Sequence, residues 1–378
     1  MNSFHSSALK CASAALAAII LGCGPRDGSK EFAQGKEAYG LRDLKKAERL
    51  FERSVALAPR DADRLLYLAR TELELGELAK AQEAVGRARE LAGGDVDVKL
   101  LAAQSAWHAK DYKGAADLFA SVANDATLEP SMRAQGWAGL GVVEMTCDNH
   151  HLARVAFLRA IRLDRRNASA WYHLGLLYRD GFGYLEASLE QFEIFVRLEA
   201  EASPRVQKVQ RTIIPALKDQ IARSATERPG ASKRNSAACA TEIAKAESAL
   251  KAGNAKQARE TYQRALAADP LSYPAALGLA KAWEKTDSTK AGQVKVFESY
   301  KVACSLRPSA VSTFLAAGSL AAKLGYTLQA VEIYSRAVAA NPYSLEAIDG
   351  LIRALRKSGG KDTVADAYQR YRDSLGKK

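Results

Sequence analysis

The sequence predicts an all-α protein in which pairs of helices repeat along the chain. The main observation is that similar segments recur about every 34 residues, which is the spacing of helical-hairpin repeats. The composition agrees with this, because only 7% of the residues are aromatic and alanine is abundant. A core of small residues suits helices that approach each other closely.

The first 22 residues have the composition of an export signal. Residues 1–10 are polar with one lysine, and residues 11–22, CASAALAAIILG, contain no charge and no proline. A polar start followed by a short apolar run is typical of a secretory signal peptide. The run is too short to span a bilayer, which takes about 20 apolar residues.

The end of this signal resembles the lipobox of bacterial lipoproteins. Residues 20–23 read Ile-Leu-Gly-Cys, two aliphatic residues and a small one before the cysteine. The resemblance implies that residues 1–22 are removed and that Cys23 carries a lipid, with 23–30 as a flexible tether. Because Gly24 follows, and not Asp, it also implies the outer membrane, facing the periplasm. An ordinary cleaved signal and an uncleaved anchor are the alternatives.

The mature chain is basic and poor in cysteine. Removing the signal takes the formal charge from +12 to +11, because the signal holds one lysine and no acidic residue. Such an excess favours acidic protein surfaces, anionic lipid or other polyanions. Cys147, Cys239 and Cys304 are too few and too far apart for a disulfide framework. We expect all three to be free and partly buried.

One large residue marks each repeat. Segments such as FERSVALAP, ending at Pro59, and YSRAVAANP, ending at Pro342, share an aromatic residue, a small residue three positions later and a final proline. The proline is expected to end the second helix of a pair, since it cannot donate a backbone hydrogen bond. The recurring position holds Phe51, Val85, Phe119, Phe157, Phe192, Tyr262, Tyr300, Tyr334 and Tyr368.

This pattern resembles the tetratricopeptide repeat (TPR), a unit of two helices. Trp137, Leu140 and Gly141 match its W-x-x-L-G motif, and residues 153–160 match its A-x-x-x-F-x-x-A motif. The resemblance implies an α-solenoid, a right-handed superhelix of helix-turn-helix hairpins that bury their apolar faces by stacking. Hairpins of another solenoid class are the alternative. We expect about nine units, at 28–60, 62–93, 96–127, 134–165, 168–202, 239–270, 273–308, 311–342 and 345–375.

The middle of the chain departs from the regular spacing. The fifth unit contains LGLLYRDGFG at 174–183, which resembles the Sel-type variant of the repeat. After it, Ser203 and Pro204 are typical of a helix N-cap and first turn, and Pro215 is expected to bend or restart that helix. A single superhelix across the whole chain is the alternative to two blocks. The expected parts are an N-terminal block at 31–202, a capping helix at 203–223, a polar linker at 224–237 and a C-terminal block at 238–378.

The sequence offers little for catalysis. It contains no GxxxxGK[ST] loop, nucleophile elbow, HExxH or paired CxxC motif, so we expect no enzyme activity, no catalytic residue and no cofactor. The segment TCDNHH at 146–151 has zinc-ligand residue types, but adjacent residues cannot easily all face one ion. We expect a solvated polar turn there and no metal site, with metal binding as the alternative.

In the TPR family the first helices line a concave groove, and the resemblance implies which positions meet a partner. The N-terminal set mixes aromatic and charged side chains, which suits an extended peptide or a helix. The C-terminal set is basic, although cations near helix C-termini also interact favourably with the helix dipole. The two sets are Phe32, Lys36, Tyr39, Arg70, Gln104, Trp107, His108, Tyr172 and Arg179, then Lys251, Lys281, Lys285, Lys323, Arg353, Arg356 and Lys357.

From these patterns we expect a noncatalytic, lipid-anchored TPR adaptor. It would hold proteins of a bacterial cell-envelope assembly of the secretion, pilus or outer-membrane biogenesis type. Its partners would be proteins in the grooves and the membrane through the lipid, with no nucleic acid. The alternative is a module that binds peptidoglycan or another anionic glycan through the basic C-terminal groove.

Overall fold

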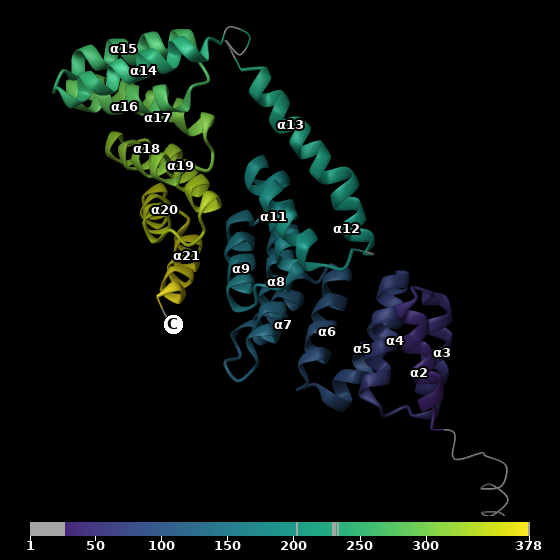
Figure 1. The fold of residues 1–378 in the computed structure, drawn as a ribbon. Helices are drawn as coiled ribbons and strands as arrows, with labels where there is room; N and C mark the ends of the chain where they lie inside the picture. Colours follow the sequence, from purple (N-terminus) through teal and green to yellow (C-terminus); the bar gives the residue numbers. More distant parts are fainter. Residues whose placement is uncertain (1–26, 202, 229–231, 233, 377–378) are drawn as a thin grey trace, which may run out of the picture. The chain divides into compact units, whose positions relative to one another are not determined.

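The structure is a computed structural model that describes residues 27–201, 203–228, 232 and 234–376. Every element in these residues is helical, which confirms the predicted all-α solenoid (Figure 1). The expected signal at 1–22 and the expected lipid site, Cys23, lie outside the described residues. None of the described helices combines the length and the hydrophobicity that crossing a membrane requires.

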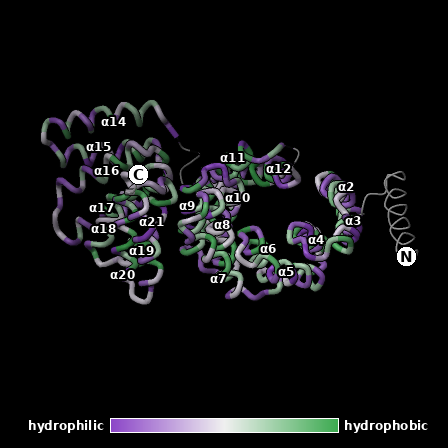
Figure 2. Tube along the Cα trace, turned by 90° about the horizontal axis from the view of Figure 1, so that it is seen from below, coloured by the Kyte–Doolittle hydropathy of each residue, from purple (hydrophilic) through white to green (hydrophobic). Residues whose placement is uncertain are grey.

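The helices follow one another as short hairpins, and most helices pack chiefly on their neighbours in the chain. Apolar and polar residues are intermixed along the helices (Figure 2). Several helices bury one face, such as Leu44–Leu57, where Ala47, Phe51 and Val55 are buried. The first helices of the pairs are α2 (Ser29–Gly40), α4 (Ala62–Leu75), α6 (Val96–His108), α8 (Pro130–Thr146), α10 (Ala168–Leu176), α14 (Ser236–Lys251), α16 (Tyr273–Thr286), α18 (Val311–Leu324) and α20 (Leu345–Ser358). The second helices are α3 (Leu44–Leu57), α5 (Leu78–Ala92), α7 (Tyr112–Asn124), α9 (His150–Leu163), α11 (Leu185–Leu198), α15 (Ala255–Ala268), α17 (Lys290–Leu306), α19 (Thr327–Ala340) and α21 (Asp362–Leu375).

The chain divides into two compact units inside α8. Unit 1 ends at Val143 and unit 2 begins at Glu144. Unit 2 therefore combines the helices from α9 to Thr226 with α14 to α21, and the division does not coincide with the expected linker at 224–237. The physical reason is a buried contact of α9 with α19 and α21, described below.

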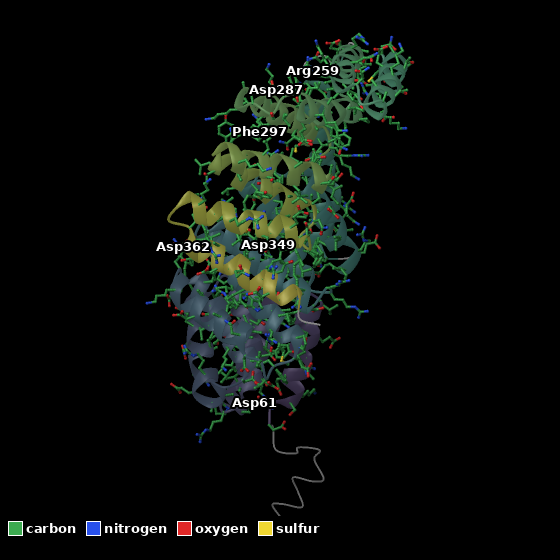
Figure 3. The ribbon with its side chains drawn as sticks, turned by 90° about the vertical axis from the view of Figure 1, so that its left-hand side faces the viewer. Asp61, Arg259, Asp287, Phe297, Asp349 and Asp362 are labelled. Atoms are coloured by element: carbon green, nitrogen blue, oxygen red, sulfur yellow. The ribbon has the colours of Figure 1, made fainter. Side chains whose placement is uncertain are left out.

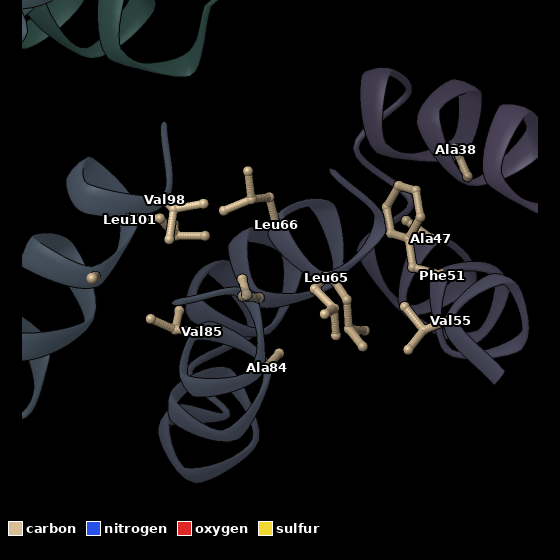
Figure 4. Close-up of a cluster of buried hydrophobic side chains, with 14 residues drawn as sticks. Ala38, Ala47, Phe51, Val55, Leu65, Leu66, Ala84, Val85, Val98 and Leu101 are labelled. Carbon is tan, nitrogen blue, oxygen red and sulfur yellow. The ribbon is translucent and has the colours of Figure 1, made fainter. Parts of the chain in front are cut away.

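The core of unit 1 runs through α3, α4, α5 and α6. Phe51, Leu65, Val85 and Leu101 are at most 5% exposed and belong to one apolar cluster (Figure 4). Each such side chain contributes about 1.5–3 kcal/mol when it leaves water. The cluster joins consecutive hairpins, so neighbouring repeats stabilise each other.

The recurring large residue of the repeat is a core residue in every case. All nine predicted positions are at most 6% exposed. Several of these rings lie against a glycine of a first helix, because a Cβ on Gly35 would overlap the Phe51 ring and one on Gly278 would overlap the Tyr262 ring. The glycines therefore set the close approach of the helices.

Short polar side chains fix where several helices begin. Asp61 precedes α4, and its carboxylate accepts a hydrogen bond of 3.2 Å from the Arg64 backbone N–H (Figure 3). Thr289 precedes α17, and its hydroxyl oxygen accepts one of 3.1 Å from the Gly292 backbone N–H. Such caps satisfy N–H groups that have no partner within the helix.

The irregular middle of the chain folds through two π-helical turns. The first, η1 (Leu177–Gly181), extends α10 and ends before Gly183, whose φ is +68°. The second, η2 (Val209–Ile213), joins α12 (Pro204–Lys208) to α13 (Ile214–Thr226). Pro215 lacks an N–H and crowds the preceding turn, which the wider π-turn accommodates.

The structure shows both ends of the expected capping helix. Ser203 is its N-cap residue and Pro204 stands in its first turn, as expected. The Ser203 side chain makes no capping hydrogen bond, and its backbone carbonyl accepts from the Gln207 N–H at 3.0 Å. The helix continues to Thr226, past the expected end at residue 223.

Candidate functional site

The first helices of unit 1 form a hollow between α4 and α6. We call it the α4–α6 hollow; it measures about 410 Å³ and is lined by Arg70, Leu73, Glu74, Gln104 and His108. Three of these, Arg70, Gln104 and His108, are positions that the sequence assigned to a groove. The structure brings them together on neighbouring first helices.

The charges of this hollow are held in place by neighbouring side chains. The Glu74 carboxylate accepts hydrogen bonds from the Tyr39 hydroxyl and the Arg42 guanidinium. Burial, followed by Glu74, raises the pKa of Tyr39 to about 12. The Arg70 guanidinium lies 5.7 Å from the Tyr67 ring centroid. The hollow thus presents both signs of charge beside the partly apolar wall of Leu73.

The first two predicted groove residues differ in their environment. Phe32 is half-buried, with its ring centroid 5.8 Å from that of Phe51 and 5.3 Å from that of Tyr67. Lys36 is exposed, and its Nζ lies 4.7 Å from the Phe32 ring centroid. Phe32 therefore packs into the start of the core, while Lys36 remains at the surface.

Trp107 and Tyr172 are also half-buried against apolar side chains. Trp107 packs against the cluster of α6 and α7, and its ring meets that of His108 at 4.9 Å. Tyr172 has its centroid 5.1 Å from that of Phe195. These contacts give both rings a packing role, and contact with a partner stays a prediction.

Arg179 is engaged by its neighbour in the chain. Its guanidinium donates two hydrogen bonds to the Asp180 carboxylate, of 2.6 and 2.8 Å. Because this pair lies in η1, the charge of Arg179 is balanced locally.

The seven residues of the predicted basic C-terminal set are all exposed. Lys251, Lys285, Lys323 and Lys357 stand in the last turn of their first helices, where the helix dipole favours cations. Lys281 stands earlier in α16. Within the described residues no ion pair involves these five lysines, whereas Arg356 pairs with Asp366 at 3.2 Å.

A second hollow carries two of the basic residues. This α20 hollow measures about 210 Å³ and lies over α18, α19 and α20, with Tyr334 and Gly350 among its lining and Arg353 and Lys357 on α20. Burial raises the pKa of Tyr334, and the nearby Arg353 guanidinium opposes this shift. The hollow therefore combines an apolar lining with two cationic groups.

A buried arginine in unit 2 was not predicted from the sequence. Arg154 on α9 is 0% exposed, and its guanidinium donates hydrogen bonds to the Tyr368 hydroxyl at 2.6 Å and to the Ser335 carbonyl at 3.0 Å. It also lies 4.8 Å from the Phe182 ring centroid. We call this set, together with His151, the Arg154 clasp. It joins second helices that are distant in sequence, so the two groups of repeats in unit 2 pack together through their second helices.

Unit 2 also holds a hollow of about 390 Å³ that is lined by both apolar and charged side chains. It was not predicted from the sequence. Its lining comes from the start of α11, the end of α13 and α17 to α19, and includes Glu186, Glu190, Arg228, Phe314 and Arg336. The Arg228 guanidinium donates a 2.6 Å hydrogen bond to the Ser305 carbonyl. Arg228, in the expected linker, is thus bound to the end of α17.

The TCDNHH turn brings the His150 imidazole close to the Asp148 carboxylate. His150 and Asp148 are 3.6 Å apart, and Asp148 has a φ of +58°. Cys147 is free and exposed, so the expectation of partial burial is wrong for this thiol, whereas Cys239 and Cys304 are free and buried. Within the described residues, three carboxylates on α3 and α4 lie close enough together to share an ion.

Comparison with known families agrees with this helical-hairpin architecture. One tetratricopeptide repeat model matches residues 38–105, and another matches residues 243–308. The chain therefore contains tetratricopeptide repeats in both units. No curated protein matches the chain.

Several solved structures are similar to the chain at low identity. They include PilF of Pseudomonas aeruginosa, with 17% identity over 55% of this chain and 95% of that one and a TM-score of 0.40. PilW, a type IV pilus biogenesis factor, has 13% identity over 67% of this chain and 98% of that one, with a TM-score of 0.40. The Cut9-Hcn1 assembly of the APC/C has 15% identity over 93% and 80%, with a TM-score of 0.38. Similarity of this degree does not identify a partner.

Proposed function

We propose that the protein is a noncatalytic scaffold that binds protein partners along its first helices. The observation that carries the proposal is the α4–α6 hollow, where Arg70, Gln104 and His108 from two consecutive repeats line one concavity. Repeats that stack as rigid hairpins present such side chains without a large ordering cost, which favours binding of an extended peptide or a helix.

The packing of unit 2 also favours the first helices as the binding surface. Its second helices α9, α19 and α21 are joined through Arg154, Ser335 and Tyr368. Surface that is already buried cannot receive a partner. The exposed lysines of α14, α16, α18 and α20 remain on the first helices.

Affinity capture with matched variants tests this proposal. Arg70→Ala combined with Gln104→Ala removes two walls of the α4–α6 hollow, and Glu83→Ala combined with Glu90→Ala changes two exposed residues of the second helix α5. The proposal expects a defined protein that the wild type and the α5 variant capture and that the hollow variant loses. Equal capture by all three forms would contradict it.

The envelope setting is the second part of the proposal. It rests on the lipobox-like residues 20–23 and the apolar run before them. The protein would have about nine repeat units, be held at the outer membrane by a lipid on Cys23 and serve an assembly of the secretion, pilus or outer-membrane biogenesis type. Intact-mass analysis of membrane-purified protein should show a mature chain that begins with lipid-modified Cys23, and an unmodified chain would remove the anchor.

An anionic glycan is a second candidate ligand, favoured by the exposed cations of unit 2. Lys281 and Lys285 take part in no ion pair within the described residues. Binding to purified cell wall should weaken steeply with salt, and Lys281→Gln with Lys285→Gln should weaken it further. Lys256→Gln with Lys290→Gln, on second helices, removes equal charge and should have little effect. Absent or salt-independent binding would exclude this candidate.

A further inference from the structure

Three glutamates of unit 1 meet where α3 packs on α4. Glu48 and Glu52 are one turn apart on α3, so they share a face of the helix, and Glu72 reaches them from α4. One carboxylate oxygen of each lies within 4.8 Å of the others. Glu48 and Glu72 are only 5% and 3% exposed, so this is a largely desolvated group of like charges.

Within the described residues, one oxygen of the Glu72 carboxylate, Oε2, is buried without a hydrogen-bond donor. Both oxygens of Glu48, in contrast, are engaged, at 2.9 Å by Lys80 and at 3.2 Å by Lys45. A buried carboxylate oxygen without a donor is unfavourable unless a cation or a proton satisfies it.

The lysines around the cluster do not balance its charge. Lys80 and Lys45 also pair with Glu77, so two ammonium groups face four carboxylates. When all four carboxylates are ionised, the remaining negative charge equals that of one divalent cation. The Lys80 side chain is 53% exposed and already lies 2.6 Å from Glu77, so it can leave Glu48 without losing every partner.

We propose that Glu48, Glu52 and Glu72 bind one calcium ion. All three donors are carboxylate oxygens, which hard cations prefer. Calcium accepts 6–8 oxygen ligands in a flexible geometry, whereas magnesium demands near-ideal octahedral coordination and keeps several waters. Three carboxylates supplied by two packed helices, with one oxygen of each within 4.8 Å of the others, therefore favour calcium.

Calcium binding is expected to stabilise the packing of α3 on α4. Calcium would connect α3 of the first hairpin to α4 of the second and relieve the repulsion within the cluster. That repulsion is also expressed in Glu72, whose pKa is raised to about 7 by burial and then by Glu48. Calcium would thus stabilise the start of the repeat array, whatever partner the array binds.

Thermal unfolding of the chelator-treated protein tests the proposal. Calcium chloride should raise the unfolding temperature of the wild type by several degrees more than magnesium chloride at equal ionic strength. Glu72→Gln, which keeps the side-chain shape, and Glu52→Gln, which changes an exposed residue, should each abolish the difference. Glu83→Gln, an exposed residue of α5, should respond as the wild type does.

Two outcomes would overturn the proposal. The first is a wild type that gains no stability specific to calcium, or a Glu72→Gln variant that gains as much as the wild type. The second is a cluster that is neutralised by a proton instead of calcium. In that case the stability of the wild type would fall as the pH rises through 7, equally with and without calcium, and Glu72→Gln would remove that fall. Circular dichroism of each variant before heating shows that it is folded at the outset.

Discussion

Replacing Arg154 tests whether its buried clasp holds the two groups of repeats of unit 2 together. The guanidinium is 0% exposed, and within the described residues no carboxylate pairs with it; its partners are the Tyr368 hydroxyl and the Ser335 carbonyl. Arg154→Ala removes two hydrogen bonds of about 1 kcal/mol each and leaves a cavity that costs about 1–3 kcal/mol. Release of a buried, unpaired charge offsets part of this loss. We expect a net destabilisation of about 3 kcal/mol.

Matched variants separate the hydrogen bonds from the volume. Arg154→Met fills much of the space without burying a charge, so it should cost less than half as much as Arg154→Ala. Arg166→Ala changes an exposed arginine just after α9 and should stay within about 0.5 kcal/mol of the wild type. Urea unfolding followed by circular dichroism measures all three.

Hydrogen exchange locates the effect. Amides of α9 and α21 should exchange faster in Arg154→Ala, while those of α2 to α5 in unit 1 should not change. A double-mutant cycle with Tyr368→Phe should give a coupling of about 1 kcal/mol. No loss of stability in Arg154→Ala, together with zero coupling, would refute the reasoning.

Three further outcomes are expected. Gly278→Ala should destabilise the protein by about 1–3 kcal/mol in urea unfolding, because its Cβ would overlap the Tyr262 ring, whereas Gly86→Ala, which has open space around it, should stabilise it by about 0.5–1 kcal/mol. Burial lowers the pKa of His151 to about 3 from 6.5. The stability contributed by the neutral imidazole is therefore fully present above pH 6.5 and is lost as the pH falls towards 3. From pH 6 to 4 the free energy of unfolding of His151→Gln should fall less steeply than that of the wild type, by up to about 1.4 kcal/mol per pH unit. Iodoacetamide followed by mass spectrometry should label Cys147 in the folded protein well before the other two described cysteines, which are buried; equal labelling of all three would contradict the fold.

The repeat was predictable because similar residues recur at a regular spacing along the sequence. The spacing of Phe51, Phe119 and Tyr334, and the prolines after the second helices, predicted where hairpins begin and end, and these residues are buried as expected. The groove position of Arg70, Gln104 and His108 followed from the resemblance to the TPR family, and the structure places them on one hollow. Local patterns carry this information because each hairpin contacts mainly its neighbours.

Contacts between distant repeats could not be predicted in the same way. Arg154 stands among apolar residues in a second helix, and nothing in its segment indicates that Tyr368 will approach it from the end of the chain. The carboxylate cluster on α3 and α4 was missed for a similar reason, because Glu48, Glu52 and Glu72 look like ordinary charges on amphipathic helices until α3 and α4 are packed. A pairing partner far along the chain leaves no periodic signal.

The most direct test of the scaffold proposal is site-specific crosslinking in the native membrane. A photo-reactive residue in place of Gln104 stands in the α4–α6 hollow, and one in place of Glu83 stands exposed on the second helix α5. The proposal predicts a discrete protein adduct from position 104 and none from position 83. An adduct from position 83 alone, or none from either position, would contradict binding along the first helices.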